Sequence, residues 1–138
     1  MKDAIEFTNR NPICYFATSV NNQPYVRALG FWFADESGFY FQTGAMKEMV
    51  GQLKANPKSE VCFYELNDMA GKMLRIEGEI EFVDDRKLKE KCLEDRPFLK
   101  QFGLTPDDPN LIIFRIPKGR GHFWTWENNL KPKEYFEF

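Results

Sequence analysis

Three short β-like segments follow one another between residues 13 and 43, and this run limits the fold more than any other feature of the chain. The segments are Ile13–Val20, Tyr25–Ala34 and Phe39–Thr43, and each is rich in β-branched and aromatic residues. Asparagine, proline, glycine and acidic residues occupy the two intervening turns. Consecutive strands joined by tight turns predict an antiparallel meander.

The rest of the chain supplies further strands and peripheral helices. Hydrophobic spacing predicts helices over Lys2–Arg10, Met46–Ala55 and Asp85–Leu93, and a short helical turn up to Phe102. It predicts strands over Ser59–Leu66, Met73–Val83, Leu111–Pro117 and His122–Glu127, followed by a polar tail. We therefore expect a mainly β (α+β) fold: a closed or partly closed antiparallel barrel of six to seven strands with two to four peripheral helices. Closure removes the edge strands that an open sheet would expose.

Length and charge narrow the class of protein. A chain of 138 residues suits a single domain spanning 1–138. The formal net charge of −2 lacks the basic footprint of a nucleic-acid-binding protein. No apolar run reaches the roughly eighteen residues that span a bilayer, and the N-terminus does not read as a signal peptide. We expect no nucleic-acid partner, no membrane insertion and a cytoplasmic location.

Cysteine and histidine offer little for metal or nucleophilic chemistry. Cys14, Cys62 and Cys92 are odd in number and widely spaced, so neither a disulfide framework nor a CxxC metal site is expected. The chain has one histidine, His122, without a cluster of metal ligands around it. We therefore expect structural thiols, no metal site, and no Ser/His/Asp or Cys/His catalysis.

Arg27 is the only charged residue in a segment, Tyr25–Ala34, that is apolar on both faces. A strand without alternation is covered on both sides, which indicates a partner subunit, a ligand or both. A buried guanidinium needs a counter-charge, so Arg27 should meet an anion. The alternatives are a salt bridge to a nearby Asp or Glu, and a side chain that reaches solvent.

Lys47 lies in the first turn of the helix predicted from Met46, where the helix dipole disfavours a cation. A phosphate at this helix N-terminus would make the arrangement favourable, because free backbone N–H groups point outward there. Thr43 would add a hydroxyl and Arg27 a bidentate fork. An exposed first-turn lysine is also common by itself, so the prediction rests on the joint occurrence of these residues.

The segments PYVRALGFWF, FYFQTGAMKEMVGQLKANP and SEVCFYE, in this order, resemble the pyridoxamine 5′-phosphate oxidase-like group of FMN-binding split barrels, including its nitroimidazole-reductase-like members. The resemblance covers nearly the whole chain and is most specific from Pro24 to Pro57. It implies a split barrel with the following cofactor contacts: Arg27 and Lys47 on the FMN phosphate, main-chain groups of Ala28 and Leu29 along the isoalloxazine, Gln42 and Thr43 at the ring or ribityl chain, and Gln52 reaching the flavin from the same or the facing subunit.

The resemblance also implies a homodimer with two FMN sites, each built from both chains. Trp124 is then a candidate contribution from the partner, stacking at or near the flavin. The alternative is that Trp124 and Trp126 cap the barrel or fill the dimer contact. His122 is expected to be a hydrogen-bonded structural residue rather than a proton donor. Aromatic residues make up 16% of the chain, and part of this excess is expected at a dimer seam and a flat-ligand pocket.

These observations favour an FMN-dependent oxidoreductase that transfers two electrons to a small, flat, electron-poor substrate, with NADH or NADPH as the candidate reductant. The chain ends in KPKEYFEF and lacks the Arg-rich C-terminal motif of true pyridoxamine phosphate oxidases, so vitamin B6 oxidation is not expected. A second hypothesis is a homodimer that holds flavin or haem for storage or sensing without turnover. A third is a structural dimer without a ligand.

Overall fold

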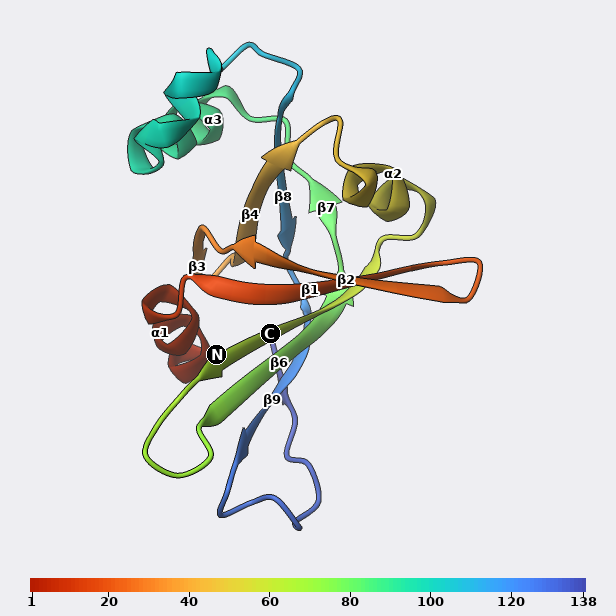
Figure 1. Ribbon diagram of the computed structural model, residues 1–138, viewed down its shortest axis with the longest axis vertical. Coiled ribbons are helices and arrows are strands. Elements are labelled where there is room, and N and C mark those ends of the chain that lie inside the picture. The colour runs from red at the N-terminus through yellow and green to blue at the C-terminus, as the bar shows by residue number, and fades with distance from the viewer.

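The computed structural model describes all residues, Met1–Phe138, as a β-rich body with helices at its periphery (Figure 1). Its helices are α1 (Lys2–Arg10), α2 (Glu48–Ala55), α3 (Arg86–Asp95) and the 3-10 helix η1 (Pro97–Phe102). Its strands are β1 (Ile13–Val20), β2 (Gln23–Gly30), β3 (Phe33–Asp35), β4 (Gly38–Gly44), β5 (Lys58–Glu65), β6 (Lys72–Glu79), β7 (Glu81–Phe82), β8 (Leu111–Ile116), β9 (Gly119–Thr125) and β10 (Phe136–Glu137).

The strands form two antiparallel sheets. One has six strands in the order β10-β9-β6-β5-β1-β2, and the other has four in the order β3-β4-β8-β7. Buried phenylalanines fill the space between them; the Phe16 and Phe41 rings meet edge to face with their centroids 5.1 Å apart, and Phe31 and Phe63 do so at 4.9 Å. The expected mainly β, α+β split barrel is therefore confirmed.

Two predicted strands are each divided where the chain passes from one sheet to the other. The segment Tyr25–Ala34 is not one strand, because β2 ends at Gly30 and β3 begins at Phe33 in the second sheet. Between them the N–H of Phe31 donates to the Pro12 carbonyl at 2.7 Å and the Phe31 ring turns into the core. The segment Met73–Val83 likewise breaks at Ile80, whose N–H donates to the Pro57 carbonyl at 2.9 Å. These corners raise the strand count above the expected six to seven.

The start of α2 differs from the expected position in a way that matters for the candidate site. Helix α1 has the predicted bounds, but α2 begins at Glu48 rather than Met46. Lys47 is extended and serves as the N-cap of α2, so it precedes the first turn instead of lying in it. The cause is a tight turn after β4, in which the Lys47 N–H donates to the Gly44 carbonyl at 3.0 Å.

The C-terminal segment is not only a polar tail. Phe136–Glu137 forms β10, which pairs with β9 at the edge of the six-stranded sheet. Phe136 and Phe138 pack against the main core, and the Phe39 and Phe138 ring centroids are 5.1 Å apart. Alternating aromatic residues in the last three positions therefore continue the sheet.

The three cysteines form no disulfide. Burial raises the pKa of the Cys14 thiol to about 12 and that of Cys92 to about 11, so both stay protonated near neutral pH. No helix of the structure is long and apolar enough to cross a membrane.

Two glycines give a matched test of the sheet packing. A Cβ at Gly119 would lie 2.0 Å from the backbone oxygen of Glu77 on β6, whereas a Cβ at Gly51 on α2 would meet nothing within 4 Å. We expect Gly119→Ala to lower the free energy of unfolding by about 1–3 kcal/mol, because β6 and β9 must separate locally. Gly51→Ala should raise it by about 0.5–1 kcal/mol through helix propensity. Urea denaturation of both variants measures the two changes, and equal effects would contradict the described β6–β9 contact.

Candidate functional site

The guanidinium of Arg27 lies on the core side of the edge strand β2, opposite Phe16 of β1. Its Nη1 donates to the Phe16 carbonyl at 3.2 Å and to the Thr18 hydroxyl at 2.9 Å, and its Nη2 donates to Gln52 Oε1 at 2.5 Å. All three acceptors are neutral, and no carboxylate forms an ion pair with Arg27. The salt bridge considered as an alternative for Arg27 is therefore absent from this structure.

Burial has an electrostatic consequence for Arg27. It lowers the pKa of the guanidinium from its ordinary value, and the more distant charge of Glu48 offsets this only partly. The group stays protonated at neutral pH, because arginine begins from a very high pKa. Arg27 is thus a fixed, partly desolvated cation that an incoming anion would stabilise.

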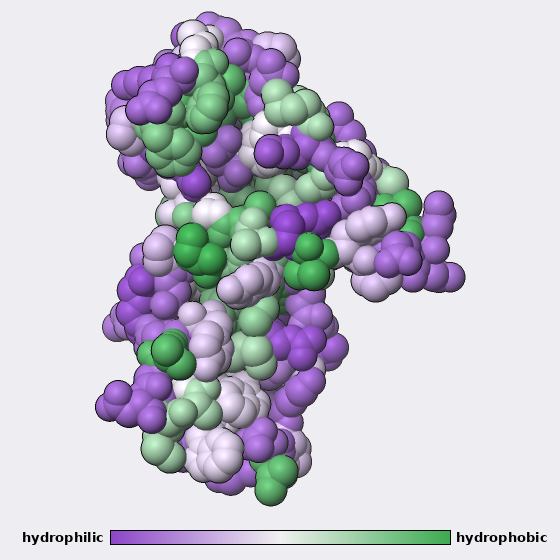
Figure 2. Space-filling view, in the orientation of Figure 1, coloured by the Kyte–Doolittle hydropathy of each residue, from purple (hydrophilic) through white to green (hydrophobic).

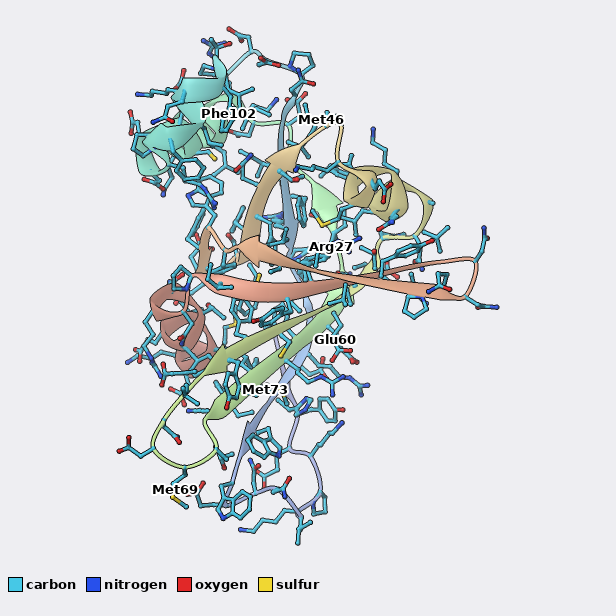
Figure 3. All side chains as sticks on the ribbon, viewed as in Figure 1. Arg27, Met46, Glu60, Met69, Met73 and Phe102 are labelled. Atoms are coloured by element: carbon cyan, nitrogen blue, oxygen red, sulfur yellow. The ribbon has the colours of Figure 1, made fainter.

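Gln52 holds this cation in place. Its Oε1 accepts from Arg27 and also from the Thr18 hydroxyl, at 2.6 Å. Gln52 lies four residues after Glu48, which is about 6 Å along the axis of α2. The fork of Arg27 is therefore anchored about one turn from the helix N-terminus. Figure 3 shows Arg27 beside β2. Sequence reasoning missed Thr18, although its alternation with Cys14 and Phe16 already placed it on the inward face of β1.

Thr43 and Lys47 lie at the two ends of the short connection from β4 to α2. Thr43 shares the inward face of β4 with Phe41, is 8% exposed, and its hydroxyl makes no hydrogen bond within the chain. Lys47 is exposed and unpaired just before the helix. The first backbone N–H groups of α2 have no acceptor inside the helix. Thr43, Lys47 and these N–H groups therefore lie along one short stretch of chain, and Arg27 contacts the same helix through Gln52.

Gln42 points away from this group of donors. It alternates with Thr43 and shares the opposite face of β4 with Tyr40, across from Ile113 of β8. The structure thus brings Arg27 and Gln52 into direct contact, places Thr43 in β4 ahead of the connection to α2, and puts the Gln42 side chain on the opposite face of β4 from Thr43.

Ala28 and Leu29 continue β2 beyond Arg27. Ala28 lies on the outer face of the sheet and Leu29 packs against the core. Because β2 is an edge strand, one side of its main chain has no neighbouring strand. Backbone N–H and C=O groups here are open to a ligand or another chain.

Trp124 is remote from Arg27 within one chain. It lies on β9, and the strand order places β9 four strand spacings, or about 19 Å, from β2. Its indole Nε1 donates to Asn129 Oδ1 at 2.9 Å. Only a second chain would bring such a tryptophan to the Arg27 site.

His122 lies on β9 beside Trp124, at a hollow of about 410 Å³. Its side chain is 5% exposed and makes no hydrogen bond within the chain. Burial lowers the pKa of His122, and the positive charges of Lys133 and Arg75 lower it further. The imidazole is therefore neutral at pH 7, and the hydrogen bond expected for a structural histidine is absent.

The outer face of the six-stranded sheet carries exposed apolar side chains. Val26 is 70% exposed and Tyr15 is 49% exposed, and Ile13 and Tyr64 are also exposed on the same face. Figure 2 shows hydrophobic side chains gathered over the β1–β2 region of the viewed surface. Tyr15 and Tyr64 are exposed aromatic residues of this face, whereas Phe31 is buried inside the chain. The dimer seam and flat-ligand pocket expected for part of the aromatic excess stay predictions.

A separate hollow of about 570 Å³ lies where β1 and β6 end and β5 and β9 begin. Glu60, Glu77, Glu79 and Glu137 line it, and Thr18 is its only link to the Arg27 site. Lys58 and Arg120 also line it, so its charged side chains sum to −2, and this negative charge disfavours a phosphate. Arg27 itself does not line this hollow.

Comparison with known proteins agrees with this architecture. A solved structure of a NimC/NimA family protein from Clostridium acetobutylicum is 31% identical and covers 100% of this chain and 93% of that one, with a TM-score of 0.82. An FAD-binding protein from Mesorhizobium loti (19% identity, 84% and 87% covered, TM-score 0.66) and a haem storage protein from Vibrio cholerae (15%, 84% and 87%, TM-score 0.65) share the fold.

No curated protein matches the sequence significantly. The model of one protein family, pyridoxamine 5′-phosphate oxidase, matches residues 1–124. With that match and the 31% identical relative, the chain belongs to the pyridoxamine 5′-phosphate oxidase family.

Proposed function

We propose that the protein binds FMN as a homodimer and transfers two electrons to a small, flat, electron-poor molecule. The observation that carries the proposal is the Arg27 guanidinium, which is fixed by three neutral oxygens and has no counter-ion in the chain. Such a cation beside a helix N-terminus favours the binding of an anion.

The residues present fit a phosphomonoester. Such a group carries between one and two negative charges near neutral pH, and Arg27 and Lys47 would supply two positive ones. The Thr43 hydroxyl is free to donate, and the first N–H groups of α2 add further donors. Gln52 and Thr18 would keep the Arg27 fork oriented while the phosphate is bound.

The rest of the cofactor would run along the open edge of β2, where main-chain groups of Ala28 and Leu29 are available. Bound flavin supplies the two-electron chemistry through its ring. The chain's own residues then bind the phosphate, orient the ring and exclude water. None of these tasks needs a histidine, which suits a chain with a single one.

A second copy of the chain would complete the site. The exposed face around Tyr15 and Val26 is apolar and adjoins the unpaired edge of β2, and a monomer would leave both in water. A two-fold dimer through this face would cover it and bring residues of the partner to each cofactor. Trp124 is the candidate for that contribution.

Titration of the cofactor-free protein with FMN tests the proposal. We expect one FMN per chain, quenched flavin fluorescence, and thermal stabilisation that grows with ligand concentration, reaching about 2.7 kcal/mol at one hundred times the Kd. Anaerobic addition of NADH or NADPH should bleach the bound flavin, and a nitroaromatic compound or a quinone should restore its colour. Absence of both bound flavin and stabilisation would refute the proposal; binding without bleaching would leave a flavin-binding protein without this turnover.

Haem binding is the second candidate, and one observation favours it. His122 is neutral, makes no hydrogen bond within the chain, and lines a hollow together with Lys131 and Lys133. The imidazole would serve as an axial ligand of haem iron, and the two lysines would pair with the haem carboxylates. The shared fold with a haem storage protein is consistent with this. Haemin titration should then give a Soret band that His122→Ala removes, while FMN binding at Arg27 is unchanged.

A further inference from the structure

A second uncompensated arginine lies at the far end of β2. Here a hollow of about 550 Å³ opens between the end of this strand and the junction of α3 with η1. Its apolar lining comes from Ile13, Phe31, Trp32 and Phe98, and its charged lining from Asp95 and Arg96. An apolar hollow with a few polar groups is the usual form of a small-molecule site.

The guanidinium of Arg96 is poorly satisfied within the chain. Its Nε is buried and has no hydrogen-bond partner. Its Nη1 and Nη2 share one acceptor, the Gly30 carbonyl, at 3.3 and 3.4 Å. A buried donor without a partner is unfavourable, and the two Nη groups, which carry four N–H donors, have only this one long contact. The fork of Arg96 therefore has unused donors for an acceptor.

The carboxylate in this hollow does not neutralise Arg96. Asp95 accepts from the Lys91 ammonium and from the Trp32 indole Nε1, the latter at 2.9 Å, and it forms no ion pair with Arg96. Burial accordingly lowers the pKa of Arg96, with no acidic residue of comparable effect to raise it. The Arg96 charge has no internal counter-ion, as with Arg27.

The walls of the hollow suit a flat ring. Arg96 Cζ lies 5.3 Å from the centroid of the Phe98 ring, which is about half exposed, and the Trp32 indole is held by Asp95. Gly30 leaves room for the guanidinium, since a Cβ there would lie 2.9 Å from Arg96 Nη2. Aromatic surfaces around a cation favour a planar ligand with an acidic group.

We propose that this hollow binds a planar aromatic carboxylate, with Arg96 as the counter-ion of the carboxylate and Phe98 and Trp32 beside the ring. Gly30 is three residues from Arg27, about 10 Å along β2, with Ala28 and Leu29 between them. The hollow therefore adjoins the strand proposed to carry the flavin ring. We infer that the bound aromatic carboxylate is the substrate of the flavin, and this part of the inference rests on the proposed function. Binding of the carboxylate at Arg96 does not rest on it.

Calorimetric titration of the FMN-free protein with benzoate, at constant ionic strength, tests the site directly. We expect one benzoate per chain, and at least tenfold weaker binding to Arg96→Gln. Arg86→Gln is the matched control, because it removes the same charge from α3 at an exposed residue already paired with Glu90. It should bind benzoate within twofold of the unaltered protein. Uncharged benzyl alcohol should bind at least tenfold more weakly than benzoate and be insensitive to Arg96→Gln.

Two results would overturn the inference. One is benzoate binding that is absent or unchanged in Arg96→Gln. The other is an Arg96→Gln variant whose only defect is weaker self-association, which would assign Arg96 to a carboxylate of a second copy. A separate FMN titration keeps the two proposals distinguishable: Arg96-dependent benzoate binding without any FMN binding would refute the proposed function and support the anion site.

Discussion

Arg27→Ala is expected to weaken FMN binding by about 100-fold, which corresponds to about 2.7 kcal/mol. The variant removes a charge-assisted fork to the phosphate, a class of interaction at the upper end for hydrogen bonds. It also removes the cation that now donates to Gln52 Oε1 and to the Thr18 hydroxyl. Flavin fluorescence quenching gives the dissociation constants of both proteins. Equal affinities would show that the phosphate does not bind at Arg27.

Two further variants test whether FMN binding depends on the overall charge of the protein or on an unpaired cation at Arg27. Arg120→Ala removes the same charge from an exposed residue that pairs with Glu77, so FMN affinity should stay within about twofold. Gln52→Glu keeps the side-chain length and gives Arg27 an internal counter-ion at the position of its present neutral acceptor. It should weaken FMN binding while the FMN-free protein loses no stability. Tight binding by Gln52→Glu would mean that the phosphate does not need an uncompensated Arg27.

Local sequence patterns determine some elements almost completely. Helix α1 and strand β1 have the expected bounds because Asn11-Pro12 ends one and the alternation of Cys14, Phe16 and Thr18 defines the other. The corner at Phe31 was not predictable in this way. Apolar residues continue through it, and the chain turns because the Phe31 N–H bonds to Pro12, far away in the sequence. Pattern alone therefore joins β2 and β3 into one strand.

The residues of the candidate site also divide into those that the local sequence indicates and those whose roles depend on tertiary packing. Arg27 is recognisable from sequence because it is a single charge among apolar neighbours. Its contact with Gln52 is not, because it depends on how α2 packs beside β1. Arg96 gives no local signal, since it follows a charged helix, and its isolation arises only where α3 meets Gly30. Gln42 and Thr43 are adjacent in sequence yet lie on opposite faces, which strand alternation enforces.

Tyr15→Asp is expected to convert the proposed dimer into a monomer and to remove most FMN binding with it. Tyr15 lies on the outer face of β1, next to the edge strand, and its ring is half exposed in a single chain. A carboxylate there has no cationic partner on its own strand, so burying it in an apolar interface would be strongly unfavourable. We expect the dimer dissociation constant to rise by on the order of 100-fold or more. Sedimentation at several protein concentrations, with and without FMN, measures this.

The fold of the single chain should survive the change, because an exposed strand position tolerates an aspartate at a modest cost in β propensity. Phe102→Asp is the matched control, since it places the same charge at an exposed aromatic position on η1 instead of the sheet. It should leave self-association unchanged. A Tyr15→Asp monomer that binds FMN as tightly as the unaltered protein would place the whole cofactor site within one chain. In that case Arg27, Thr43 and the start of α2 would suffice, and Trp124 of a partner would have no part in binding.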